Sequence, residues 1–293
     1  MSKIPTGTIT LNPITVKSGG WWCSKVSPGC ANCYAEYINQ HDRFNRGNSL
    51  PYQGSPPELT LNREMLGSWC RMRKHHFIFV GSMTDIFGEW IDRNWHFEIL
   101  DAMLASPNQT FQLLTKRPQV MLSTTMAWIE ARNLLALPPN IWVGATTEDQ
   151  RTFNERIPTL LKIPAWVRWL TVEPMLEEIN PMKPGQSLFP TITRKEKELW
   201  QEYLPLHQHI DWVILGFESG HKARVGQLSW MRSFVRMCTL AQTEQNAALA
   251  IYVKQLGSNC WDGEKPFKLK SARTGGTNIE EFPTDLQMRQ MPL

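Results

Sequence analysis

Short apolar runs rich in β-forming residues recur along this chain, and stretches with helical periodicity lie between most of them. The clearest runs span residues 76–80, 110–114, 140–144, 167–172, 211–216 and 248–254. Because these runs lack strict apolar–polar alternation, they favour strands covered on both faces. Strands that alternate with helices and need crossover connections form a parallel sheet. The sequence therefore predicts an α/β fold with parallel strands.

Local signals refine this pattern. A weaker run at residues 8–16 contains Pro13, which cannot donate a ladder hydrogen bond, so we expect an edge or bulged strand there. Asp92 is placed to cap a helix that ends before Pro107, and Pro118 stands where a first-turn proline is tolerated. We also expect Ser229 to cap a later helix.

The chain has 293 residues, enough for one barrel-like domain with additions, and we expect that domain to span residues 1–257. A cysteine-containing loop occupies residues 17–36 within it. Residues 39–62, rich in Asn, Gly, Pro and Ser, predict a long loop, and residues 176–209 predict an insertion. The polar residues 258–293 are expected to form a C-terminal extension packed on the barrel.

Composition excludes several classes of protein. Six cysteines in 293 residues are too few for a disulfide scaffold. No run approaches the roughly 18 consecutive apolar residues of a transmembrane helix, and the first residues lack the apolar core of a signal peptide. We therefore expect a cytoplasmic protein that does not insert into a membrane. The net charge of +4 permits contact with nucleic acid without arguing for it.

Polar residues follow the predicted strands at the point where each strand ends. In parallel α/β folds the loops at the carboxyl ends of the strands converge on one mouth. The residues of interest at these ends are Gly81, Ser82, Asp85, Lys116, Thr146, Glu148, Glu173, Glu218 and Lys254. Taken alone, each of these residues could equally well cap a loop or form an ion pair at the rim instead of contacting a ligand. Their recurrence on one rim predicts a functional site there.

Three of the six cysteines form the pattern C-x6-C-x2-C, at Cys23, Cys30 and Cys33. The C-x2-C half brings two thiolates to one metal, and the turn at Pro28 and Gly29 can bring the first cysteine close. Three thiolates leave a four-position site one ligand short. Zinc would need a fourth ligand, for which His41 is a candidate, or would keep an open catalytic position. A [4Fe–4S] cluster would keep one iron free to bind a ligand.

Several motifs together are more specific than any one alone. They are SPGCANCYAE, GSMTDIF, FQLLTKRP, IWVGATTEDQ, RIPTLL, TVEPML, DWVILGFESG, YVKQLG and GGTNIEEFP. In these motifs, and in Cys23 upstream of them, the chain resembles a phage-associated three-Cys-motif family of radical-SAM-like proteins, over about residues 11–283. The resemblance implies a partial (β/α) TIM-like barrel whose first loop holds a [4Fe–4S] cluster on the three cysteines.

The resemblance also implies a chemistry. S-adenosylmethionine (SAM) would bind the unique iron through its amino and carboxylate groups, and an external electron donor would supply the electron for its reductive cleavage. The products would be methionine and a 5′-deoxyadenosyl radical, which abstracts a hydrogen atom from the substrate. The sequence does not identify that substrate. Phage association makes a nucleobase or nucleotide the substrate class of interest.

By position in such a barrel, the rim residues divide into two groups, and none of them is assigned a catalytic role. Those expected to contact SAM are Gly81, Ser82, Asp85, Thr146, Glu148, Glu173 and Glu218. Lys116 and Lys254 are expected to neutralise a carboxylate or a phosphate of the substrate. Many radical-SAM proteins carry an aromatic residue just before the last cysteine, where this chain has Asn32.

Two other functions remain open from the residues themselves. One is a non-enzymatic module, stabilised by an iron–sulfur cluster or zinc, that binds nucleic acid or a partner protein. For a nucleic-acid substrate or partner, the candidate phosphate contacts are Arg63, Arg71, Arg73 and Lys74 around Trp69. The other is a zinc-dependent hydrolase that activates a water on the three cysteines, although no H-E-x-x-H motif accompanies them.

Overall fold

The computed structural model describes residues 8–41, 46–182, 209–245 and 249–292. Most of the insertion predicted at residues 176–209 lies outside the described residues. In the described parts of the chain, no helix is long and apolar enough to cross a membrane.

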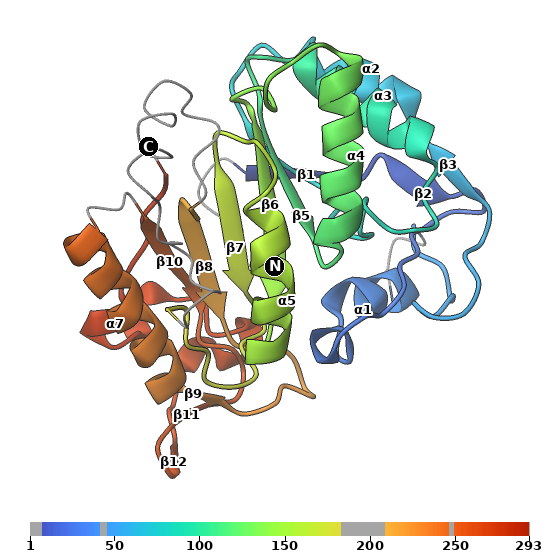
Figure 1. Ribbon diagram of the computed structural model, residues 1–293. Helices are drawn as coiled ribbons and strands as arrows, with labels where there is room; N and C mark the ends of the chain where they lie inside the picture. Colours follow the sequence, from blue (N-terminus) through green and yellow to red (C-terminus); the bar gives the residue numbers. More distant parts are fainter. Residues whose placement is uncertain (1–7, 42–45, 183–208, 246–248, 293) are drawn as a thin grey trace.

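Seven strands form the central sheet, in the order β1-β4-β5-β6-β7-β8-β10, and every neighbouring pair is parallel. The sheet curls into a half barrel with helices on its outer side (Figure 1). The strands are β1 (Thr8–Leu11), β4 (Phe77–Val80), β5 (Thr110–Thr115), β6 (Ile141–Thr147), β7 (Arg168–Val172), β8 (Trp212–Gly216) and β10 (Ala250–Gln255). This architecture confirms the predicted α/β fold with parallel strands, arranged as part of a (β/α) barrel.

Six α-helices are described alongside the strands. They are α1 (Tyr34–His41), α2 (Arg63–Trp69), α3 (Arg93–Leu104), α4 (Pro118–Ala131), α5 (Gln150–Leu160) and α7 (Leu228–Gln245). As predicted, Asp92 caps α3 by accepting a hydrogen bond from the Asn94 amide at 2.8 Å, and Pro118 opens α4. The prediction for Ser229 is wrong by position. The short strand β9 (Gly226–Gln227) runs directly into α7, which begins at Leu228.

The N-terminal segment divides at Pro13. Strand β1 ends before it and forms the edge of the parallel sheet, as the missing N–H of proline predicts. Strand β2 (Ile14–Val16) follows and pairs in antiparallel fashion with β3 (Leu59–Leu61). Strand β3 lies in the segment predicted as a long loop, because three residues are too few to show a strand pattern among so many turn-forming neighbours.

The two faces of the sheet are packed differently. On the outer face, aliphatic and Phe side chains of the strands pack against the helices. On the concave face, the tryptophans Trp142, Trp169 and Trp212 pack with Tyr252. The Trp169 indole lies over Gly144, where a Cβ would come within 2.6 Å of the ring. These tryptophans are core residues rather than exposed platforms for stacking a base.

The C-terminal residues pack on the barrel. Strands β11 (Cys260–Asp262) and β12 (Lys265–Pro266) form a small sheet with β9. The last described residues then run back along the edge of β10, where the Gln290 amide donates to the Ile251 carbonyl at 3.0 Å.

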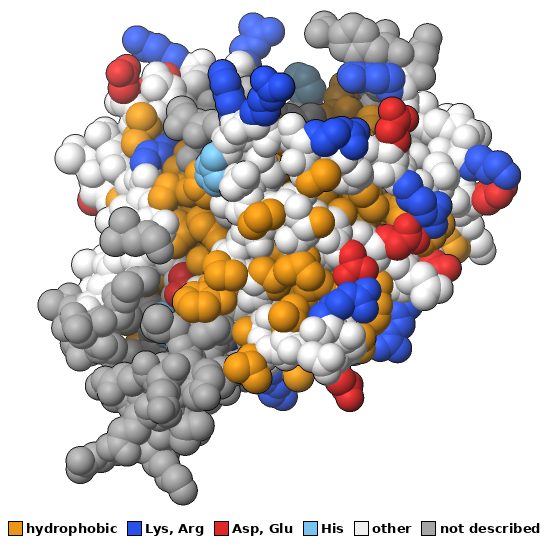
Figure 2. All heavy atoms as spheres, turned by 90° about the horizontal axis from the view of Figure 1, so that it is seen from above, with side chains coloured by type: hydrophobic (Ala, Val, Ile, Leu, Met, Phe, Trp, Pro, Cys, Tyr) orange, Lys and Arg blue, Asp and Glu red, His pale blue; other side chains and the backbone are white. Residues whose placement is uncertain are grey.

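The face opposite α1, viewed from above in Figure 2, shows hydrophobic side chains in its middle and Lys and Arg side chains mostly around them.

Candidate functional site

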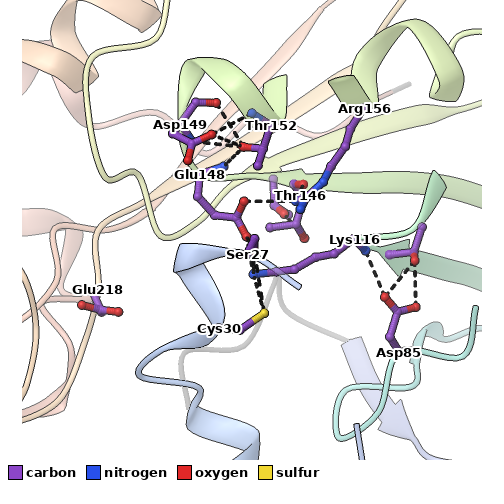
Figure 3. Close-up of polar contacts among 12 residues, drawn as sticks. Ser27, Cys30, Asp85, Lys116, Thr146, Glu148, Asp149, Thr152, Arg156 and Glu218 are labelled. Atoms are coloured by element: carbon purple, nitrogen blue, oxygen red, sulfur yellow. Dashed lines mark hydrogen bonds and ion pairs between the residues drawn. The ribbon is translucent and has the colours of Figure 1, made fainter. Parts of the chain in front are cut away.

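The cysteine loop lies against the carboxyl ends of the central strands. Its short 3₁₀ turn, Pro28–Cys30, touches residues that follow β5 and β6. In Figure 3, Ser27 and Cys30 approach from one side, with Lys116 reaching toward them and Glu148 above. The rim predicted from the strand ends and the loop predicted from the cysteine spacing therefore contact each other and form one site.

Lys116 is the centre of this contact. Its ammonium forms an ion pair with Glu148 and donates to Ser27 Oγ at 3.3 Å and to Cys30 Sγ at 3.5 Å. The Ser27 hydroxyl donates in turn to Glu148 Oε1 at 2.6 Å. One lysine side chain thus joins β5, the cysteine loop and the residue that follows β6.

Glu148 is held from a second side as well. Its side chain is completely buried, and its Oε2 accepts a hydrogen bond from Arg156 Nη1 at 3.0 Å. Arg156 reaches it from α5, whose start is fixed by a capping box between Asp149 and Thr152. A buried carboxylate is stable only when it is paired and hydrogen-bonded, and Glu148 meets both conditions.

Gly29 lets the loop come this close. A Cβ at Gly29 would lie 2.5 Å from Glu148 Cγ, well inside van der Waals contact. The glycine that the sequence suggests as part of a turn therefore has a second role, because only a residue without a side chain fits between the cysteine loop and the buried carboxylate.

A second group of charges holds the start of the loop. Arg117 donates through Nη2 to the Ser24 carbonyl at 2.8 Å, and it pairs with Asp85 at 3.2 Å and Glu89 at 2.7 Å. Asp85 also accepts the Thr115 hydroxyl at 2.7 Å. The oxygens of Asp85, expected from the sequence to contact SAM, are thus engaged by donors of the protein, which makes Asp85 an anchor for Arg117.

Two further rim positions touch the cysteine loop. The Tyr34 hydroxyl, next to Cys33, donates to the Ser82 carbonyl at 3.0 Å. Gly81, just before Ser82, has a φ of +81°, a conformation that favours glycine, and a Cβ there would lie 2.4 Å from Ile86. The turn after β4 therefore packs directly against the residues that follow the last cysteine.

Glu218 is linked to the loop through Asn32. Its carboxylate accepts from the Asn32 amide at 3.0 Å and from Arg224 at 2.7 and 3.0 Å. Although burial opposes ionisation, the hydrogen bonds from Arg224 and Asn32 hold the pKa of Glu218 below its usual value. Glu218 therefore ties the loop after β8 to the cysteine loop.

The remaining predicted residues have partners outside the cysteine loop, and one of them does not lie at the mouth. Glu173 and Lys254, from the ends of β7 and β10, pair with each other at 2.8 and 2.9 Å and are each partly exposed. Thr146 lies inside β6 rather than after it, and its hydroxyl accepts from Thr171 at 2.9 Å in the interior.

The three thiols differ in their electrostatic surroundings. Burial alone would raise the pKa of Cys30, but the nearby Lys116 ammonium and hydrogen bonds from the loop lower it below its usual value. Burial and the Asp85 carboxylate raise the pKa of Cys23 to about 12. Burial also raises the pKa of Cys33, and the charge of Cys30 adds to this effect.

These three thiols are the groups of the loop that would hold a metal or an iron–sulfur cluster. All three are free, and each is only partly exposed. Within the residues that the structure describes, no three His, Cys, Asp or Glu side chains come close enough to hold one metal ion. A [4Fe–4S] cluster would bind each cysteine sulfur to a different iron, and three thiols on one loop fit that set of donors. His41, the candidate zinc ligand, stacks on Tyr37 and bonds its carbonyl at 2.9 Å.

Several residues of this site do not stand out in the sequence. Arg117, Arg156, Arg224 and Ser27 each complete a contact between the loop and the rim. Arg117 directly follows Lys116 in the strand-end motif, so its position carried a signal. Arg156 lies within α5. The one signal for it is that the buried carboxylate of Glu148 needs a second cation as partner.

Comparison with known proteins assigns the chain to a family. Neither the curated proteins nor the solved structures contain a match. The model of a family described as protein of unknown function (DUF5131) matches residues 2–283, and the chain belongs to this family.

Proposed function

We propose that this protein is a radical-SAM-like enzyme that binds a [4Fe–4S] cluster through Cys23, Cys30 and Cys33. The observation that carries the proposal is the contact between the three-cysteine loop and the carboxyl-end rim of a parallel half barrel. In parallel α/β folds that rim is where chemistry takes place. The motifs shared with phage-associated radical-SAM-like proteins support the same function.

When bound, the cluster supplies one electron for the reductive cleavage of SAM, received from an external donor. The chain's own residues hold the thiols in place. Lys116 contacts the sulfur of Cys30, Arg117 holds the carbonyl of Ser24, and Asn32 tethers the segment between the second and third cysteines. The partners of the cysteine loop in these contacts come from two loops of the rim, after β5 and after β8, so the loop is held before a cluster forms. A cytoplasmic location would keep the thiols reduced.

The pair of Glu173 and Lys254 is the proposed site for the methionine part of SAM. Glu173 offers a carboxylate and Lys254 an ammonium at the same rim, with 19% and 17% of their side chains exposed. With the amino nitrogen and the carboxylate of SAM bound to the iron, the amino N–H groups could still donate to Glu173 and a carboxylate oxygen could still accept from Lys254, so the pair can exchange its internal ion pair for contacts with the ligand. The proposal of a nucleobase or nucleotide as substrate rests on the family resemblance.

Anaerobic purification and reconstitution with iron and sulfide test this function. We expect iron and sulfide bound in the ratio of a [4Fe–4S] cluster, and formation of 5′-deoxyadenosine when SAM and a strong reductant are added. Cys30→Ala should abolish cluster binding. Cys70→Ala, which removes an exposed thiol from the end of α2, is the matched control and should retain it. Retained cluster in C30A, or no SAM cleavage by the reconstituted protein even with cell extract as substrate source, would contradict the proposal.

A further inference from the structure

Lys116 stands in direct contact with one of the proposed cluster ligands. We infer that Lys116 is a positioning residue that donates an N–H···S hydrogen bond to the Cys30 sulfur and makes the cluster easier to reduce. This inference rests on the proposed function and adds to it a residue that controls the electron-accepting step. It is carried by the arrangement of Lys116, Ser27, Glu148 and Arg156 around that sulfur (Figure 3).

The direction of the hydrogen bonds follows from the partners. A lysine ammonium has three N–H donors and no acceptor, and Lys116 has three acceptors around it, on Glu148, Ser27 and Cys30. The Ser27 hydroxyl has a single proton, which it donates to Glu148 at 2.6 Å. Ser27 therefore has no proton left for Cys30. Lys116, at 3.5 Å, is therefore the charged side chain that donates to the sulfur when it is a thiolate, in addition to the backbone hydrogen bonds of the loop itself.

The charge beside Cys30 is also positive overall. Lys116 and Arg156 share the single carboxylate of Glu148, so two cations face one anion. Glu148 is completely buried and the Lys116 side chain is 20% exposed, so solvent screens these charges weakly. Because Glu148 is held from two sides, the ammonium cannot swing away from the sulfur without leaving its own counter-ion.

A positive charge near a cluster favours its reduced form. Reduction adds one electron and makes the cluster with its thiolates more negative, while no proton moves on Lys116. Charge, hydrogen bonds to the sulfurs and exposure to solvent set the reduction potentials of iron–sulfur clusters. An ammonium that donates to a ligating sulfur therefore stabilises the reduced state more than the oxidised one.

The test measures the reduction potential of the reconstituted cluster by a redox titration followed by electron paramagnetic resonance. Lys116→Met removes the charge and the donor but keeps an unbranched side chain of similar length. We expect the equilibrium for reduction to become about tenfold less favourable, which for one electron is about 59 mV. Lys116→Arg keeps the charge and should recover most of this difference. Lys162→Met, after the far end of α5, removes the same charge from an exposed position and should leave the potential unchanged.

The outcomes separate the inference from the proposed function. A wild-type protein that binds no iron–sulfur cluster contradicts the proposed function itself. A K116M cluster with the wild-type potential, or an equal fall in K116M and K116R, overturns the role of Lys116 while leaving the function intact. If K116M does not hold a cluster, Lys116→Gln replaces it. This variant removes the charge but keeps an N–H donor, so a smaller fall in potential relative to K116R is expected, and a K116Q cluster with the potential of K116R overturns the role of the Lys116 charge.

Discussion

Two groups of charged residues flank the cysteine loop, and they have opposite signs. Near Cys30, the cations Lys116 and Arg156 share the carboxylate of Glu148. At the start of the loop, the single cation Arg117 is shared by the carboxylates of Asp85 and Glu89. We call them the Glu148 group and the Arg117 group. One leaves a positive charge and the other a negative charge beside the same loop.

The two groups also hold different parts of the loop. The Glu148 group contacts a sulfur atom and a side chain, whereas the Arg117 group contacts the backbone carbonyl of Ser24. Burial, with the Asp85 carboxylate, raises the pKa of the Cys23 thiol, whereas the Lys116 ammonium and hydrogen bonds from the loop hold the pKa of Cys30 below its usual value despite burial. The comparison indicates that the Glu148 group sets the electrostatic surroundings of the Cys30 sulfur, while the Arg117 group mainly holds the backbone of the loop in place. The following predictions test this division.

The largest effect is expected for Glu148→Gln. The change leaves the charges of Lys116 and Arg156 without their buried counter-ion, and breaking a buried ion pair in this way costs about 3–5 kcal/mol of unfolding free energy. Urea denaturation of the protein measures it. Glu89→Gln is the matched change in the Arg117 group, where the Glu89 side chain is 64% exposed, and should cost about 0–1 kcal/mol. Equal losses of unfolding free energy in the two variants would show that burial does not make the ion pairs of the Glu148 group stronger than those of the Arg117 group.

Gly29→Ala should have the next largest effect, because the added methyl would lie 2.5 Å from Glu148 Cγ. Glu148 cannot move aside without giving up Lys116 or Arg156, so we expect a loss of about 1–3 kcal/mol from overpacking. Gly67→Ala in α2 is the control. Its nearest atom is 3.7 Å away, and alanine in a helix is expected to stabilise the protein by about 0.5–1 kcal/mol. A G29A protein as stable as the wild type would mean that the loop does not press against Glu148.

The pH dependence of thiol alkylation examines the same division in the protein without a cluster. The thiolate is the reactive form, and a lower pKa leaves more thiolate at a given pH. Cys30 should therefore react at a lower pH than Cys23, whose pKa is about 12. Lys116→Met should move the Cys30 profile toward higher pH, and Lys162→Met should not. Mass spectrometry of the labelled peptides gives each profile. Identical profiles for Cys23 and Cys30 would contradict the claim that the two thiols differ in pKa.

Much of this site follows from two sequence patterns. The strand ends placed Asp85, Lys116 and Glu148 on one rim, and parallel topology made them converge, as the structure shows. The spacing of the cysteines marked the loop. Both patterns are local, because each depends on residues close together in the chain.

The contacts between the two patterns could not be predicted in the same way. Asp85 faces Arg117 and Thr115 instead of open solvent, which depends on the side-chain directions of neighbouring loops. Ser27 reaches Glu148 across 121 positions of sequence. Such pairings arise from packing in three dimensions, so a residue type and its strand end can identify the rim but not the partner of each side chain.

The smallest effect is expected for Asn32→Ala, which cuts a third tether that belongs to neither group. Asn32 joins the loop to Glu218 at 3.0 Å and to the Lys222 carbonyl at 2.9 Å, and it carries no charge. Arg224 keeps Glu218 paired after the change, so no buried charge is left alone and the loss should be about 0.5–1.5 kcal/mol. Faster hydrogen exchange should be confined to the loop around residues 27–34, with the Cys30 alkylation profile unchanged. A shift of that profile in N32A would mean that the thiol is conditioned by the position of the whole loop, and the Glu148 group would then lose its separate role.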